Sequence, residues 1–278
     1  MKLLSDKRTY FSIFGAIGGL ISAFIYIGLG FDSAFSSWIL GTGFDGMCIA
    51  TLLAFGQTKY VGKSFDKKAI GRAALIGAFG GFIGGGIAFL VGLPIVSLLG
   101  GGTDAGRFLG WAIGGIVIGF AVSKVIPNLK SSIASLAGGV GGFLGCFLMY
   151  LISSYSLGVA TTGAAIGLAI ALFETAFRQV WLEITIRPKG FSLEKERTVS
   201  VSLGDKPIVF GCAHDSDVKL AEVEGAQAHF AKVSLVKGKA VLFNIVTNKT
   251  SDLDYNEEFD VSNAHIVVRS KTATVNIT

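Results

Sequence analysis

The chain has 278 residues, of which 51% are hydrophobic and 15% charged, with a formal net charge of +5. This apolar content excludes general disorder, and the 39 Gly show no three-residue period, which excludes collagen. Residues 1–187 contain 34 Gly and have a net charge of +6, whereas the rest of the chain contains 5 Gly and has a net charge of −1. The basic charge therefore belongs to the apolar part of the chain. This indicates a membrane protein with cationic loops and argues against a nucleic-acid-binding surface.

Six apolar runs are long enough to cross a bilayer as helices, for which about 20 residues are needed. They cover roughly residues 10–30, 37–57, 73–100, 108–126, 134–154 and 157–177. The third run is over-long, and Pro94 is a candidate break within it. No small-residue cleavage site follows the first run, so we interpret it as a span and not as a signal peptide.

The charges between the spans predict their orientation. Cations such as Lys7, Arg72 and Arg178 fall in the connections assigned to one side, whereas the other side contains Arg107 beside Asp104. Because cytoplasmic loops carry an excess of Lys and Arg, this alternation predicts an even number of spans and two cytoplasmic termini. The expected location is a bacterial inner membrane.

Glycines recur at a fixed spacing in the spans. "GAIGGL" begins at Gly15, "GAFGGF" at Gly77 and "GGVGGF" at Gly138, at offsets of 62 and 61 residues. We therefore predict three tandem hairpins of two helices each, in which small residues four apart let backbones touch. The predicted packing glycines are Gly15, Gly19, Gly77, Gly81, Gly138 and Gly142 in the odd spans and Gly110, Gly114, Gly163 and Gly167 in the even spans.

Two acidic residues fall within predicted spans: Asp45 near the middle of the second and Glu174 near the inner end of the sixth. An intramembrane acid is a candidate proton or cation site. The alternatives for Asp45 are a structural hydrogen bond to a neighbouring helix or a shifted second span in which it lies shallower. The alternative for Glu174 is a carboxylate at the cytoplasmic interface. Gly41, Gly43 and Gly46 spell a dinucleotide-binding fingerprint, but it lies inside a predicted membrane helix, so we interpret it as chance.

Beyond Arg187 the pattern changes to short alternating segments rich in Val, Ile, Phe and Thr. The expected strands are "TVSVSL", "KPIVFG", "DVKL", "HFAKVSLV", "KAVLFNIV", "EFDV", "HIVVRS" and "TATVNIT". Strands about ten residues apart predict a β-sandwich, for which "WLEITIR" from Trp181 would supply the first strand. The predicted domains are therefore a six-helix membrane bundle, residues 1–180, and an all-β sandwich, residues 181–278.

The stretch "IVFGCAHDSDVKLAEVEGAQAHFAKVSLVKGKAVLFNI" resembles the core of a forkhead-associated (FHA) domain. In that family a strand ends in Gly-Arg, a loop leads into a short strand, Ser-x-x-His follows, and a Gly turn joins two paired strands. Gly211, the strand from Ser216, His229 and Lys237-Gly238 occupy these places, and "LDYNEEFDVSNAHIVV" resembles the closing hairpin. Gly-rich spans leading into such a domain also resemble bacterial polytopic membrane proteins.

Two of the family's phosphothreonine-binding positions have changed. The resemblance implies that the Arg after the Gly and the Ser three residues before the His bind phosphate, and here they are Cys212 and Ala226. Neither side chain replaces a guanidinium or a hydroxyl donor. Asn248 is the nearest candidate for the family's peptide-gripping Asn, and His229 supports the loop without contacting ligand. We therefore expect no phosphothreonine recognition by the usual route.

These patterns predict a non-catalytic scaffold that holds a protein partner, or another membrane subunit, at the cytoplasmic face. The alternative is a small channel or transporter with a regulatory sandwich, in which Asp45 is the first residue to test. No catalytic triad or metal cluster can be assembled, and the three Cys are far apart, so we expect no enzyme, no metal and no cofactor. The expected partners are membrane lipid and protein, not nucleic acid, and Gly-rich faces are also compatible with self-association.

Overall fold

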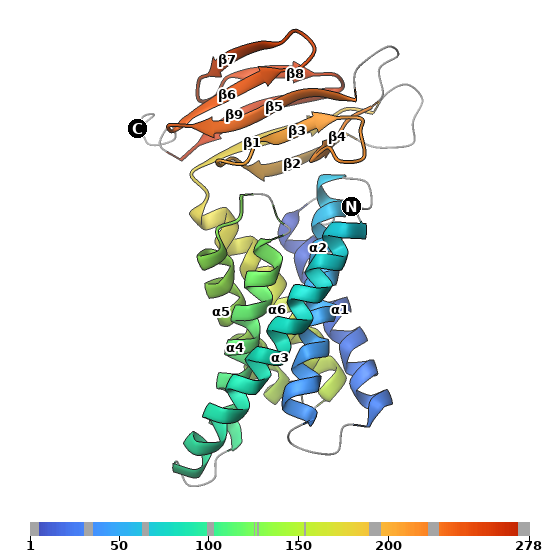
Figure 1. Cartoon of the computed structure of the whole chain (residues 1–278), viewed down its shortest axis with the longest axis vertical. Helices are drawn as coiled ribbons and strands as arrows, with labels where there is room; N and C mark the ends of the chain where they lie inside the picture. The colour runs from blue at the N-terminus through green and yellow to red at the C-terminus, as the bar shows by residue number, and fades with distance from the viewer. Residues whose placement is uncertain are drawn as a thin grey trace. The chain divides into compact units, whose positions relative to one another are not determined.

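The structure is a computed structural model (Figure 1). It describes residues 6–30, 36–62, 67–98, 103–124, 126, 128–152, 154–188, 196–221 and 228–271. Two compact units are present. The helical unit comprises residues 6–57 and 67–176, and the β unit is built mainly from residues 177–278.

Within the described residues, six helices are long and apolar enough to cross a membrane, as predicted. They are α1 (Lys7–Leu29), α2 (Thr42–Val61), α3 (Lys67–Leu98), α4 (Thr103–Ser123), α5 (Ser131–Ile152) and α6 (Tyr155–Phe177). A short π-helical segment, Ser36–Gly41, leads into α2. By the length and apolar character of these helices, the chain is a multi-pass membrane protein.

Helix α3 is not broken at Pro94, because it continues through this residue to Leu98. Proline fixes a φ close to the helical value and removes one N–H donor, which a membrane helix tolerates. Helix α4 also begins earlier than the apolar run indicates, so that Arg107 lies within the helix and not in a connection.

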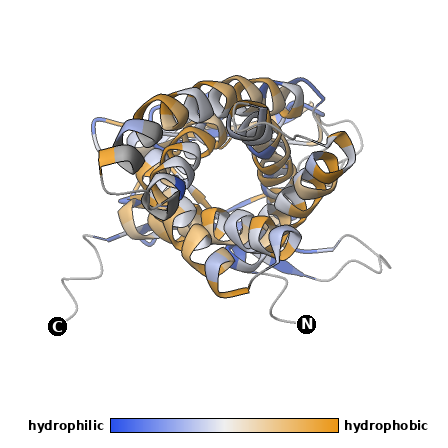
Figure 2. Ribbon diagram, turned by 90° about the horizontal axis from the view of Figure 1, so that it is seen from below, coloured by the Kyte–Doolittle hydropathy of each residue, from blue (hydrophilic) through white to orange (hydrophobic). Residues whose placement is uncertain are grey.

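The outer surface of the helical unit is apolar. Seen end-on in Figure 2, the helices lie around a common centre. Phe24 of α1, Phe79 of α3 and Phe147 of α5 are each more than half exposed. Large apolar side chains facing outward on successive helices are typical of a surface that meets lipid and not water.

Glycines bring the backbones of three helix pairs into direct contact. A side chain at any of these positions would collide with a backbone oxygen of the facing helix. The mutually facing pairs are Gly15 with Gly163 (α1–α6), Gly77 with Gly46 (α3–α2) and Gly138 with Gly115 (α5–α4). One turn later, Gly19, Gly81 and Gly142 face the backbone oxygens of Val159, Thr42 and Trp111. Such close approach gains dispersion contacts that lipid cannot supply.

In α4 the predicted packing glycines differ from those that touch a neighbouring backbone. Nothing lies within 4 Å of where a Gly114 side chain would begin, and at Gly110 the nearest atom is the Ala88 Cβ at 3.3 Å. Gly115 and Gly119 instead face the backbone oxygens of Gly138 and Ala134. Gly167 of α6 faces the backbone oxygen of Phe11.

The β unit contains nine strands in its described part, arranged in two sheets (Figure 1). They are β1 (Val180–Ile186), β2 (Arg197–Ser202), β3 (Ile208–Gly211), β4 (Val218–Lys219), β5 (His229–Val236), β6 (Lys239–Asn244), β7 (Lys249–Leu253), β8 (Glu258–Val261) and β9 (Ala264–Ser270). The sheet orders are β2-β1-β9-β8 and β4-β3-β5-β6-β7. Only the β3–β4 pair is parallel among these described strands.

Alternating residues of both sheets form the core of the β unit. Leu182 and Ile266 of one sheet and Ile208 and Phe210 of the other are fully buried. The first strand follows α6 after two residues, as predicted from "WLEITIR". The expected strand "TATVNIT" lies outside the described residues, and β7 is a strand that the sequence pattern did not predict.

Candidate functional site

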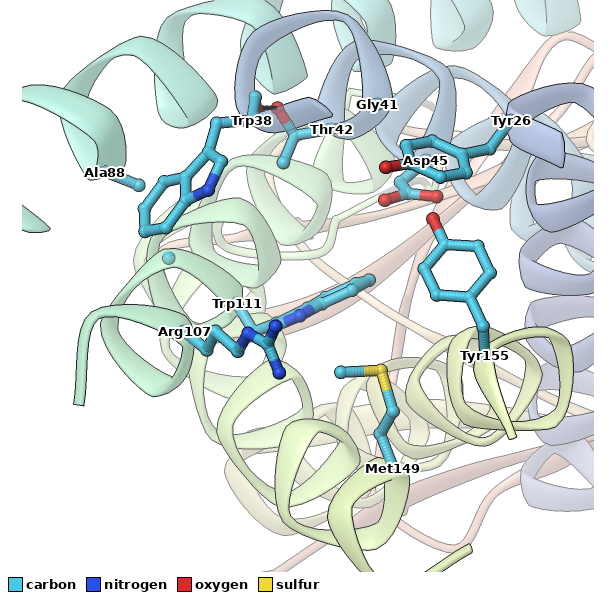
Figure 3. A pocket seen from close by; sticks show the side chains of 11 residues that line it. Tyr26, Trp38, Gly41, Thr42, Asp45, Ala88, Arg107, Trp111, Met149 and Tyr155 are labelled. Carbon is cyan, nitrogen blue, oxygen red and sulfur yellow. Dashed lines mark hydrogen bonds between the residues drawn. The ribbon is translucent and has the colours of Figure 1, made fainter. Parts of the chain in front are cut away.

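A cavity of about 240 Å³ lies within the helical unit (Figure 3). Every helix contributes to its wall: Tyr26 from α1, Asp45 from α2, Ala88 from α3, Arg107 from α4, Met149 from α5 and Tyr155 from α6. These residues lie where the odd helices end and the even helices begin. The site is therefore at the end of the bundle opposite the predicted cytoplasmic connections.

Asp45 forms the acidic wall of this cavity, and it lies in the first turn of α2 and not near the middle of the span as the sequence indicated. Its side chain is buried, and the Ser22 hydroxyl of α1 donates a hydrogen bond of 2.5 Å to its Oδ1. The rings of Tyr26 and Tyr155 lie 4.8 Å apart, and the Tyr155 hydroxyl points toward the Asp45 carboxylate in Figure 3. A buried carboxylate in an aromatic surrounding favours a cationic partner.

Arg107 supplies the opposite charge. It lines the cavity together with Trp111, on the side away from Asp45 in Figure 3. The residue is exposed, and no ion pair among the described residues joins it to Asp45. The cavity thus presents one acid and one base that do not neutralise each other by direct contact.

An irregular helix start shapes the third wall. Trp38 and Gly41 line the cavity from the π-helical segment before α2. The Thr42 hydroxyl lies 2.5 Å from the Trp38 carbonyl oxygen and 2.9 Å from that of Gly81 in α3, and shares its single proton between these acceptors. This π-helical segment contributes Trp38 and Gly41 to the cavity wall. Such turns often occur at functional sites, which supports a functional role for the cavity.

Apolar side chains fill the interior beyond Asp45. One turn along α2 from Asp45 lies Ile49, and one turn further lies Leu53, both fully buried. They belong to one cluster with Ile118 of α4 and Ile166 of α6. A buried apolar layer of this kind opposes the passage of ions unless it rearranges. We call this buried cluster next to Asp45 the apolar floor of the cavity.

Glu174, the second intramembrane acid, takes no part in the cavity. It is buried near the end of α6, with its Oε2 3.0 Å from the Nζ of Lys7 at the start of α1. The Lys7 ammonium also lies 5.5 Å from the centre of the Phe11 ring. This ion pair joins the first and last helices, so the structure gives Glu174 a bridging contact between helices.

The FHA-like positions lie at one end of the β unit. Gly211 ends β3 beside the Ala228 carbonyl, and the Cys212 thiol lies 3.7 Å from that same oxygen. His229 begins β5, with its Nε2 2.8 Å from Asp215 Oδ1. Ala226 is outside the described residues. Asn248 has a φ of 54° in the exposed turn between β6 and β7, at the same end of the sheet as Gly211 and His229.

A second hollow, of about 400 Å³, lies in the β unit between β6 and β8. Phe230, Leu242, Val246, Phe259 and Val261 give it apolar walls. Strand β8 is the last strand of its sheet in the described part, and Phe259 and Val261 alternate with exposed Glu258 and Asp260. An edge strand with unpaired backbone groups next to an apolar hollow can accept an extended peptide.

The sequence patterns identified Asp45 but not the residues that share its cavity. The aromatic residues and Arg107 come from α1, the π-helical segment, α4 and α6, and none belongs to a recognised motif. The sequence signal that could have identified them is their constant spacing from the helix-packing glycines of each hairpin. Among the described residues, no group of three His, Cys, Asp or Glu is placed to hold a metal ion.

Comparison with known proteins gives no match to a protein-family model, to a curated protein or to a solved structure.

Proposed function

We propose that this protein is an integral membrane scaffold that presents a non-catalytic, FHA-like β-sandwich at the cytoplasmic face. The sandwich binds a protein partner, or another membrane subunit, without requiring phosphothreonine. The observation that carries this proposal is the apolar hollow beside the free edge of β8, in a domain whose family-like loop has lost its phosphate-binding Arg to Cys212.

The charges at the helix ends support a cytoplasmic β unit. Cations gather where α1, α3 and α5 begin and where α2, α4 and α6 end: Lys7, Arg8, Lys59, Lys67, Lys68, Arg72, Lys124, Lys130 and Arg178. Arg107 lies at the other end of its helix. This asymmetry follows the positive-inside rule and favours an inner-membrane location with both termini in the cytoplasm.

The order of the strands supports the FHA-like assignment. Gly211 ends a strand, Val218–Lys219 form a short strand after a loop, and His229 begins the next one. Lys237 and Gly238 then form the turn between β5 and β6, both with positive φ, and β8 and β9 form the closing hairpin. This order of elements is the one that the resemblance implies, which supports the proposal.

The helix contacts support three tandem hairpins. The first Gly of each predicted copy meets the backbone of an even helix, namely α6, α2 and α4. The same contact thus recurs three times around the helical unit, and each time it joins neighbouring hairpins. Exposed apolar surface on the odd helices is available for lipid or for a second copy of the chain.

Site-specific photo-crosslinking tests the proposed scaffold role in the full-length protein. A photoreactive residue at Val246, which is 57% exposed at the hollow, should give a discrete adduct, whereas one at exposed Lys239 on the same sheet should not. Phe259→Asp should abolish the adduct, and phosphatase treatment should leave it unchanged. Equal adducts at both positions, or loss after phosphatase treatment, would contradict the proposal.

A transporter is the second candidate, because the helical unit contains a cavity with a buried carboxylate. The apolar floor opposes an open channel, so transport would require that layer to rearrange. Ion and proton flux into proteoliposomes, compared between the native chain and Asp45→Asn, distinguishes the two functions. Flux that depends on Asp45 supports transport, and its absence supports the scaffold.

A further inference from the structure

The cavity residues occupy equivalent positions in the three hairpins. Tyr26, Ala88 and Met149 are 62 and 61 residues apart, the same offsets as Gly15, Gly77 and Gly138. Each therefore lies 11 residues beyond the first Gly of its copy. Three helices thus bring the same structural position to the cavity with three different side chains.

The even helices show the same relation. Their facing glycines, Gly46, Gly115 and Gly163, are 69 and 48 residues apart. The cavity residues Trp38, Arg107 and Tyr155 have these same offsets. Gly41 with Gly110, and Thr42 with Trp111, also lie 69 residues apart and line the cavity. The cavity therefore lies on the approximate threefold axis of the repeats.

The three hairpins have different residues at the cavity, but the same residue type one helical turn away from it. Asp45 corresponds to Gly114 and Thr162 in the other two hairpins. One turn further from the cavity, the equivalent residues are Ile49, Ile118 and Ile166, all buried and in one cluster. A packing requirement keeps the three copies alike, whereas an asymmetric ligand requires them to differ. Among the described residues that line the cavity, Asp45 and Arg107 are the one acid and the one base, and they are such a difference.

The chemistry of the walls indicates what would bind. A buried carboxylate with two Tyr rings and Trp38 nearby suits an ammonium group, which gains both charge attraction and cation–π contact. The exposed guanidinium of Arg107 suits a carboxylate or phosphate. The cavity volume of about 240 Å³ suits a compact molecule. We propose that this cavity binds a small zwitterion, with its ammonium toward Asp45 and its anionic group toward Arg107.

Two sources can supply this chemistry: a free solute and the headgroup of a zwitterionic lipid. The test uses the full-length protein in nanodiscs of phosphatidylglycerol, which has no ammonium group. Trp181→Phe leaves Trp38 and Trp111 as the two fluorescent reporters, both at the cavity. Glycine betaine is titrated first, and phosphatidylcholine or phosphatidylethanolamine is then incorporated in a separate series.

A free-solute site is supported if glycine betaine gives a saturable fluorescence change and Asp45→Asn lowers its affinity about tenfold. Change only with the zwitterionic lipids, again weakened by the same variant, supports a headgroup site. Arg107→Gln should lower the affinity for either zwitterion but leave the affinity for tetramethylammonium unchanged. This variant keeps the test decisive if Asp45→Asn does not fold. Asp252→Asn on the exposed face of β7 is the matched control.

Absence of any change that depends on Asp45 or Arg107, with solute and with lipid, overturns the proposal. If Arg107→Gln lowers the affinities for the zwitterion and for tetramethylammonium equally, the assigned orientation is also wrong. The measurement is independent of the proposed scaffold role, because it involves only the helical unit.

Discussion

Lys7 Nζ lies 3.0 Å from Glu174 Oε2, and both side chains are buried. The contact joins α1 to α6, the two helices that are furthest apart in the helical part of the chain. The equivalent residues of the other two hairpins are Gln57 in α2 and Ile126 just after α4, 117 and 48 residues before Glu174. The ion pair therefore occurs at the one junction between hairpins that no short connection holds.

Removing one member of this pair should destabilise the bundle strongly, because it leaves a buried charge without its partner. Lys7→Met and Glu174→Met should each lower the free energy of unfolding by about 3 kcal/mol, whereas the double variant should lose less than the sum of the two. Thermal unfolding in detergent, followed by the loss of monomeric protein on gel filtration, measures both. The exposed pair Lys239 and Asp252, 4.0 Å apart, is the control and should contribute below about 1 kcal/mol. Losses that add independently would refute the coupling.

The glycines of the helix pairs should respond to substitution according to the backbone they face. Gly163→Ala places a methyl group against the Gly15 carbonyl and should cost about 1–3 kcal/mol by overpacking. Gly114→Ala enters open space and should be neutral or stabilise by up to about 1 kcal/mol, because Ala favours helix. Thermal unfolding of the two variants compares them directly. Equal effects at both positions would show that these contacts do not determine packing.

Phosphothreonine should not increase the affinity of the full-length protein for a peptide, because Cys212 offers no cationic donor at the family's Arg position. Fluorescence anisotropy with a peptide library and its phosphorylated counterpart measures the ratio of affinities, which we expect to be close to one. Cys212→Arg with Ala226→Ser restores the two lost donors and is the matched gain-of-function variant. Micromolar, phosphate-dependent binding by the native chain would contradict the expectation.

The sequence alone predicted six spans, because about 20 apolar residues in succession have few other stable environments. It also located most strands, which alternate apolar and polar residues. Strand β7 was missed because Lys249–Leu253 is exposed at four of its five positions and lacks this alternation. Its partner β6 defines it, and a polar edge strand has no sequence period of its own.

The position of the packing glycines in α4 shows a second limit. Gly110 and Gly114, like Gly115 and Gly119, are four residues apart, so spacing does not distinguish the two pairs. Only the rotation of the helix decides which pair faces α5, and tertiary packing sets that rotation. The cavity escaped prediction for a related reason: Asp45 stood out as an intramembrane acid, whereas Arg107 lay just outside the expected span.

Six crossings would leave the β unit in the cytoplasm, which the proposed scaffold role requires. Cys212 is partly exposed in that unit, whereas Cys48 and Cys146 are buried in the helical unit, so a membrane-impermeant maleimide reports on one site. Inverted membrane vesicles should label at Cys212, right-side-out vesicles should not, and Cys212→Ser should remove the signal. Labelling of Cys212 in sealed right-side-out vesicles would place the β unit outside and contradict the account.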